Sequence, residues 1–296
     1  MKLKQLVVLA IALLFVLPAC QEPQILPTEP APVVEISEPV AEIVPTDTAV
    51  PQPTNESTPK PTNEPAAAPP TMFPETAVTQ PSTENITIEA ADGLLLHATL
   101  SMPGGIAPFP GVILLHMLGS DRQVWVDVGL TDALLADGYA VLALDMRGHG
   151  ESGSDREWEK ADDDLMRVWQ YFVGLENVDE GETAVIGASI GSNMALRTGA
   201  NQPAIKTVVL LSPGLDYRRV TTDDAIVLYG DRPILIVASE EDSYAADSSR
   251  TLAELAQGEA VLQMYNGAGH GTNMFAAEPG LTQLLLDWLN QFLLES

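Results

Sequence analysis

Cysteine is almost absent from this chain of 296 residues, because Cys20 is the only one. A single cysteine excludes an intramolecular disulfide, so the fold has to be held by packing and polar contacts. Lys and Arg are also scarce, at 14 residues against 41 Asp and Glu. The resulting net charge of −27 repels nucleic acid, and we expect no nucleic-acid function.

The N-terminal apolar stretch, residues 6–17, is too short to span a bilayer, which takes about 20 residues. It follows Lys2 and Lys4, an arrangement typical of a secretory signal peptide. The stretch ends in Leu-Pro-Ala-Cys at residues 17–20, which resembles the lipobox of bacterial lipoproteins. That resemblance implies cleavage before Cys20 and a diacylglyceryl group on its thiol. An ordinary secretory peptide with a nearby cysteine is the alternative.

These features predict a lipoprotein signal peptide at residues 1–20. Residues 21–84 hold 15 prolines among repeated Pro-Thr and Glu-Pro pairs. Proline lacks the N–H that a helix or sheet needs, so this segment is expected to be a disordered tether. The predicted location is the extracytoplasmic side of a bacterial membrane, with the lipid as the membrane contact.

Residues 85–296 carry the pattern of one folded domain. Residues 85–101 read as a hairpin with an Asp-Gly turn at 92–93. Six short apolar runs then alternate with helical patterns, which predicts a doubly wound, mostly parallel α/β sheet with an antiparallel hairpin at its start. The runs are residues 111–116, 140–146, 184–188, 207–211, 234–238 and 260–265, and the helical patterns lie near 125–137, 158–175, 191–199, 243–256 and 281–294.

The sequence Gly187-Ala188-Ser189-Ile190-Gly191 lies where a buried strand meets a helix. This is the G-x-S-x-G nucleophile elbow, in which a sharp strand-to-helix turn exposes the serine hydroxyl at the carboxyl edge of the sheet. A Gly-Ser turn without catalysis is the alternative. The position after an apolar strand favours Ser189 as a nucleophile.

A serine hydroxyl needs a base, and a group that orients the base. His270 is the one histidine after Ser189, and it lies in a glycine-rich loop between the last strand and the last helix. Asp242 follows the strand at 234–238 and is our predicted acid. Asp216 and Glu241 are the competing carboxylates.

Together these segments resemble the α/β-hydrolase superfamily, and within it the dienelactone-hydrolase-like group. The segments are residues 113–119, the Asp-x-Arg-Gly-His-Gly loop at 145–150, the elbow, and residues 233–242. The resemblance implies an oxyanion hole formed by the amides of Ile190 and Leu118, and structural roles for His116 and His149. Met117 stands where the family usually has glycine. Only about 21 residues follow Leu211 before Pro233, so no large lid is expected.

The predicted function is a serine hydrolase that cleaves carboxylic esters with small or accessible acyl groups. A peptidase or thioesterase would use the same residues, and a surface-binding lipoprotein that retains the fold is a further alternative. The histidines are scattered and no cysteine accompanies them, so we expect no metal site. No cofactor is implied either.

Overall fold

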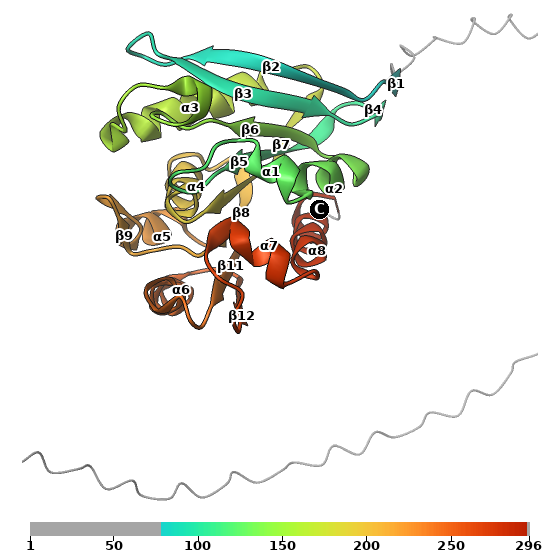
Figure 1. Ribbon diagram of the computed structural model, residues 1–296. Coiled ribbons are helices and arrows are strands. Elements are labelled where there is room, and N and C mark those ends of the chain that lie inside the picture. Colours follow the sequence, from blue (N-terminus) through green and yellow to red (C-terminus); the bar gives the residue numbers. More distant parts are fainter. Residues whose placement is uncertain (1–77, 295–296) are drawn as a thin grey trace, which may run out of the picture. The chain divides into compact units, whose positions relative to one another are not determined.

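The computed structural model describes residues 78–294 (Figure 1). Cys20, the expected signal peptide and nearly all of the expected tether lie outside these residues. Within the described part, no helix combines the length and apolar composition needed to cross a membrane.

An eight-stranded sheet organises the domain, in the order β12–β11–β8–β7–β5–β6–β3–β2. Six strands pair in parallel, while β3 joins β6 antiparallel and β2 joins β3 antiparallel at the edge. The expected fold, a mostly parallel sheet with an N-terminal hairpin, is therefore confirmed. The strands are β2 (Ser82–Glu89), β3 (Leu95–Met102), β5 (Phe109–Leu115), β6 (Ala140–Leu144), β7 (Val178–Ala188), β8 (Ile205–Leu211), β11 (Ile234–Ser239) and β12 (Ala260–Tyr265).

Two of these strands begin earlier than the sequence pattern indicates. β2 begins at Ser82, so three of its residues precede position 85. β7 begins at Val178, with a polar and half-exposed first segment that the apolar-run criterion does not detect. A short strand β1 (Val78–Thr79) also pairs with β4 (Gly105–Ile106) beside the main sheet.

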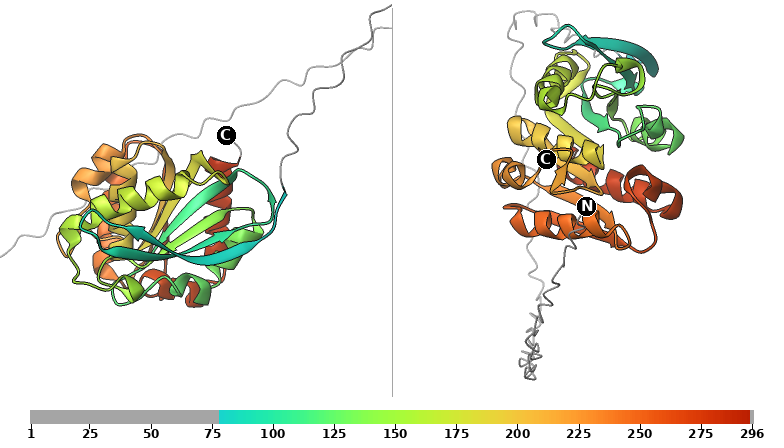
Figure 2. Two further views of the ribbon diagram at one scale, coloured as in Figure 1. Left: turned by 90° about the horizontal axis from the view of Figure 1, so that it is seen from above. Right: turned by 60° about the vertical axis from the view of Figure 1, so that its left-hand side comes forward.

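Alternate side chains of the central strands point to opposite faces, and each face has its own apolar core. In β5, Ile113 and Leu115 belong to one core, and Val112 and Leu114 to the other. Within residues 78–294, helices cover both faces of the sheet (Figure 2). The first face carries α3 (Ala161–Val173), α4 (Ile190–Asn201), α5 (Asp223–Tyr229) and α6 (Ser243–Leu255); the second carries α1 (Val124–Asp127), α2 (Leu130–Ala136), α7 (Met274–Ala277) and α8 (Leu281–Leu293).

The helix expected at residues 125–137 is divided into α1 and α2. Gly129 separates them with φ of 77°, a left-handed conformation that interrupts a right-handed helix. The segment between β8 and β11 holds only a hairpin, β9 (Asp216–Tyr217) and β10 (Val220–Thr221), followed by α5. This agrees with the expectation that no large lid is present.

A buried ionic cluster ties the sheet to α3. Arg147, in the loop after β6, is 4% exposed and donates from Nε and Nη2 to both carboxylate oxygens of Asp164, each at 2.7 Å. Its Nη1 also donates to Asp92 in the β2–β3 turn, at 2.8 Å. Asp164 is itself 3% exposed, so its charge depends on this arginine.

We expect Arg147→Met to lower the free energy of unfolding by about 3–5 kcal/mol, because it leaves the Asp164 carboxylate buried and unpaired. Arg167→Met is the matched control, since Arg167 pairs with Asp163 on the exposed surface of α3, the helix that carries Asp164. That change should cost less than about 0.5 kcal/mol. Urea denaturation measures both. Equal losses in the two variants would contradict a special role for the buried pair.

Candidate active site

The turn at Ser189 has the backbone geometry of a nucleophile elbow. Ser189 lies between β7 and α4 with φ of 54° and ψ of −121°, a strained conformation for a residue with a side chain. A Cβ at Gly187 would stand 2.0 Å from the carbonyl oxygen of Gly191, and a Cβ at Gly191 would stand 2.3 Å from that of Leu115. Both glycines are therefore required by backbone packing around the serine.

The structure brings together the three residues that the sequence proposes for catalysis. Nε2 of His270 lies 2.7 Å from Oγ of Ser189, and Nδ1 of His270 lies 2.5 Å from Oδ2 of Asp242. Ser189, Asp242 and His270 follow β7, β11 and β12, so all three lie at the carboxyl ends of parallel strands. With Asp242 ionised, Nδ1 carries the proton, which leaves Nε2 free to accept the proton of the serine hydroxyl.

The two competing carboxylates have other partners. Glu241 accepts hydrogen bonds from the Ser239 hydroxyl and the Gly267 amide. The bond from Gly267 is the main reason that its pKa is lowered. Asp216 is exposed in the β9–β10 hairpin and accepts a bond from the Arg219 amide at 2.7 Å. Asp242 is thus the carboxylate that contacts His270, while Glu241 supports the loop that carries this histidine.

Two serines that sequence reasoning missed hold the histidine loop. The hydroxyl of Ser212, directly after β8, accepts a bond from the Gly271 amide at 2.9 Å. The hydroxyl of Ser239, at the end of β11, accepts one from the Ala268 amide at 3.0 Å. The sequence does carry a signal for these two serines, since each is a small polar residue at the end of a buried strand, next to the expected position of the triad.

The expected oxyanion groups lie on the other side of Ser189, at the end of β5 and the start of α4. Ile190 is the first residue of α4, where amides lack an intrahelical acceptor. Among the described residues, neither a carbonyl nor a side chain accepts a bond from the Leu118 amide, and the same holds for Met117. Donors for a developing negative charge are therefore present on this side.

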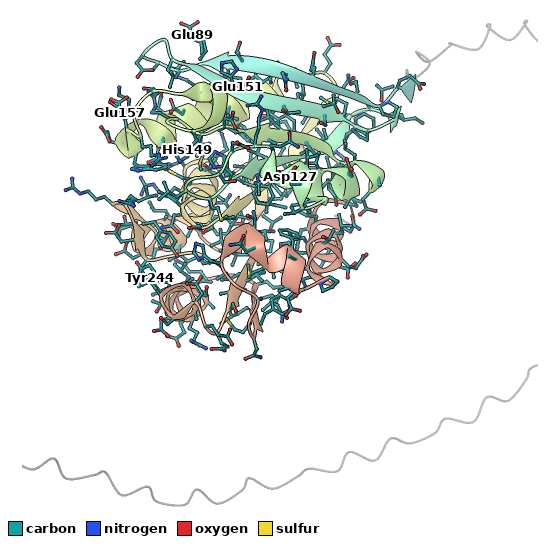
Figure 3. All side chains as sticks on the ribbon, viewed as in Figure 1. Glu89, Asp127, His149, Glu151, Glu157 and Tyr244 are labelled. Carbon is teal, nitrogen blue, oxygen red and sulfur yellow. The ribbon has the colours of Figure 1, made fainter. Side chains whose placement is uncertain are left out.

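His116 and His149 lie beside the site and outside the Ser189–His270–Asp242 contact chain. Burial lowers the pKa of His116 to about 4, so its imidazole is neutral at neutral pH. It donates from Nδ1 to the Met117 carbonyl at 2.9 Å and accepts from the Met146 amide at Nε2, at 3.1 Å. His149, labelled in Figure 3, packs edge-on against it with ring centroids 4.9 Å apart. The pair joins the loops after β5 and β6.

Residues 78–294 include no cluster of three or more His, Cys, Asp or Glu side chains that could hold a metal ion. Ser189 is 7% exposed and the side chain of His270 is 36% exposed, so the serine hydroxyl is recessed while the imidazole is open to solvent.

Comparison with solved structures places this geometry in a known fold. The described domain resembles a dienelactone hydrolase from Anabaena variabilis (TM-score 0.58, 19% identity, 73% of this chain and 100% of that chain). It also resembles an esterase from Pyrococcus furiosus (TM-score 0.61, 17% identity, 72% and 91%). A third similar structure is Est1E from Butyrivibrio proteoclasticus with bound ferulic acid (TM-score 0.59, 22% identity, 71% and 98%).

The domain has the α/β-hydrolase fold. A model of the serine aminopeptidase S33 family matches residues 108–230, which include Ser189 and end before Asp242 and His270. No curated protein matches the chain. Together the fold and the family match support a hydrolase, and the sequence-based assignment to dienelactone-hydrolase-like α/β-hydrolases agrees with them.

We expect Asp242→Asn to slow the labelling of Ser189 by a fluorophosphonate probe by several orders of magnitude at neutral pH. The amide no longer holds the Nδ1–H tautomer or stabilises the imidazolium, and the same change in a serine protease costs about 10⁴ in turnover. Asp216→Asn, the matched control, should label at nearly the normal rate. The opposite ranking would assign the acid to the loop after β8. Small losses in both variants would indicate that Ser189 and His270 work without an acid, or that Glu241 is the acid.

Proposed function

We propose that this domain is a serine hydrolase that cleaves carboxylic esters through an acyl-enzyme. The observation that supports it best is the double contact of His270, which bridges Ser189 Oγ and Asp242 Oδ2 within 2.7 Å on each side. This is the arrangement of nucleophile, base and orienting acid that acyl transfer requires.

In the first half of the reaction, Ser189 Oγ attacks the ester carbonyl while Nε2 of His270 takes its proton. The Asp242 carboxylate stabilises the imidazolium that forms. Amides of Ile190 and Leu118 hold the oxyanion, and each such donor contributes about 3–4 kcal/mol in measured systems. The imidazolium then protonates the departing alcohol oxygen, which leaves the acyl group on Ser189.

In the second half, water replaces the alcohol and His270 again acts as the base. Attack of water on the acyl-enzyme gives a second oxyanion in the same position, and collapse of that intermediate releases the acid and restores Ser189. The solvent exposure of His270 suits this step, because the water has to reach Nε2 directly.

The expected substrates carry small or accessible acyl groups. The hairpin and α5 between β8 and β11 are too short to enclose a long chain, which disfavours buried lipid substrates. The family match to serine aminopeptidases favours a second candidate, hydrolysis of an aminoacyl bond by the same residues. A thioesterase would also use this chemistry.

Ser189→Ala should abolish ester hydrolysis without unfolding the protein, since it removes only one hydroxyl group. Activity on p-nitrophenyl esters of graded acyl length should fall as the chain lengthens, and aminoacyl p-nitroanilides test the peptidase alternative directly. Retention of more than a few per cent of the wild-type turnover in Ser189→Ala would reject the nucleophile assignment. Circular dichroism of the variant provides the folding control.

We also propose that the chain is a lipoprotein of the bacterial cell envelope, anchored through Cys20. The support is the charge, length and Leu-Pro-Ala-Cys ending of residues 1–20. The proline-rich residues 21–84 would then act as a tether that lets the hydrolase domain reach its substrate.

Cys20→Ser should move the full-length protein from the membrane fraction to the soluble extracytoplasmic fraction, or block its processing, because serine cannot receive the thioether-linked lipid. Cell fractionation and the molecular mass of the mature protein measure the effect. A processed Cys20→Ser protein that still sediments with membranes would show that another feature anchors it.

A further inference from the structure

The short hairpin formed by β9 and β10 is fixed to the helix that follows the nucleophile. Asn193, fully buried in the first turn of α4, donates from Nδ2 to the Val220 carbonyl at 2.7 Å. Its Oδ1 accepts from the Gly214 amide at 3.0 Å. The Thr222 hydroxyl closes the segment by donating to the Gly214 carbonyl at 2.9 Å. The hairpin therefore holds a defined position relative to Ser189.

A tyrosine on α6 holds the other side of the hairpin. The hydroxyl of Tyr244 accepts a bond from the Asp216 amide at 2.9 Å and donates one to the Asp216 carbonyl at 3.0 Å. Its ring packs against that of Tyr217 with centroids 5.5 Å apart. Figure 3 labels Tyr244 next to α6, on the side of the β9–β10 hairpin. A Cβ at Gly214 would stand 2.7 Å from the Tyr217 ring, so this packing is close.

These contacts place Tyr217 over the catalytic residues. Its ring meets the imidazole of His270 edge-on, with centroids 6.3 Å apart and planes at 89°. Its hydroxyl donates to the Ser212 carbonyl at 3.3 Å, longer than the 2.7–2.8 Å usual for such a bond. Ser189 lies beside the same hydroxyl, near enough for its side chain to affect the pKa of Tyr217.

The Tyr217 hydroxyl has one hydrogen-bond acceptor, the Ser212 carbonyl, and lies beside Ser189. The hydroxyl of Ser189 gives its own proton to His270, so toward Ser189 the phenol acts as the donor. Burial raises the pKa of Tyr217 well above its ordinary value, and the nearby Asp242 charge raises it further. The group therefore stays a neutral donor at neutral pH, held beside Ser189 by a long bond to the Ser212 carbonyl.

Tyr217 and the Leu118 amide lie on opposite sides of β7. Sheet order is β8–β7–β5, and Tyr217 enters from the β8 side while Leu118 follows β5. An ester attacked by Ser189 turns its carbonyl oxygen toward the β5 side. Its alcohol oxygen has to lie near Nε2 of His270 to receive a proton, and the Tyr217 ring lies against this imidazole.

We infer that Tyr217 is a further catalytic residue, whose hydroxyl donates a hydrogen bond to the leaving-group oxygen as the tetrahedral intermediate collapses. In that step the bond from carbon to the alcohol oxygen breaks and its electron pair goes to that oxygen. The oxygen takes the proton from the His270 imidazolium, and Tyr217 keeps its own proton. This role rests on the proposed ester hydrolysis. It adds Tyr217 to that reaction as the group that assists departure of the alcohol.

The test compares Tyr217→Phe with wild type on acetate esters whose alcohols differ in pKa. For ethyl acetate, whose alkoxide is a poor leaving group, kcat/KM should fall about 10–100-fold, the value of one hydrogen bond to a charged group. For p-nitrophenyl acetate, whose leaving group needs little assistance, the loss should stay below about threefold. The dependence of kcat/KM on leaving-group pKa should become steeper, with phenyl acetate between the two.

Tyr229→Phe is the matched control, because it removes the hydroxyl of another buried tyrosine, which lies on α5 and donates to the Pro233 carbonyl at 2.8 Å. It should change kcat/KM by a similar factor for all three esters. Fluorophosphonate labelling of Tyr217→Phe at a near-normal rate shows that Ser189 and His270 are intact. Equal losses on all esters in Tyr217→Phe would overturn the leaving-group role. A wild-type protein that labels but cleaves no ester would reject the proposed function, and this inference with it.

Discussion

The close approach of two backbones at the elbow is the constraint on which the rest of the site depends. Gly187 and Gly191 leave no room for a side chain between the end of β7, the first turn of α4 and the end of β5. Only in that packing is the strained conformation of Ser189 held. The strain points the hydroxyl out of the sheet, where His270 can reach it from three strands away.

The positions of Ser189, Asp242 and His270 could be predicted because each follows an apolar strand. Apolar runs mark such strands in the sequence, and parallel strands bring their carboxyl ends to one edge. The sequence favoured Asp242 over the adjacent Glu241, and the structure shows that Asp242 is the one in contact with His270. Their roles differ through the direction of one side chain, which a linear pattern does not record.

The position of Tyr217, and the hairpin that carries it, could not be predicted from the sequence. The strands β9 and β10 have two residues each, too few for any periodicity. Their position depends on contacts with Asn193 and Tyr244, which are distant along the chain. The break between α1 and α2 was missed for a related reason. An isolated glycine inside a helical pattern is often tolerated, and only the left-handed φ of Gly129 shows that the helix ends there.

Arg218 and Arg219 form the tip of this hairpin, both with positive φ and exposed to solvent. The contacts that hold the hairpin against α4 and α6 are made by residues on either side of the tip. The chain can therefore be lengthened at the tip while these contacts are kept. For protein engineering, this tip is the point where a grafted loop would not have to support the position of Tyr217.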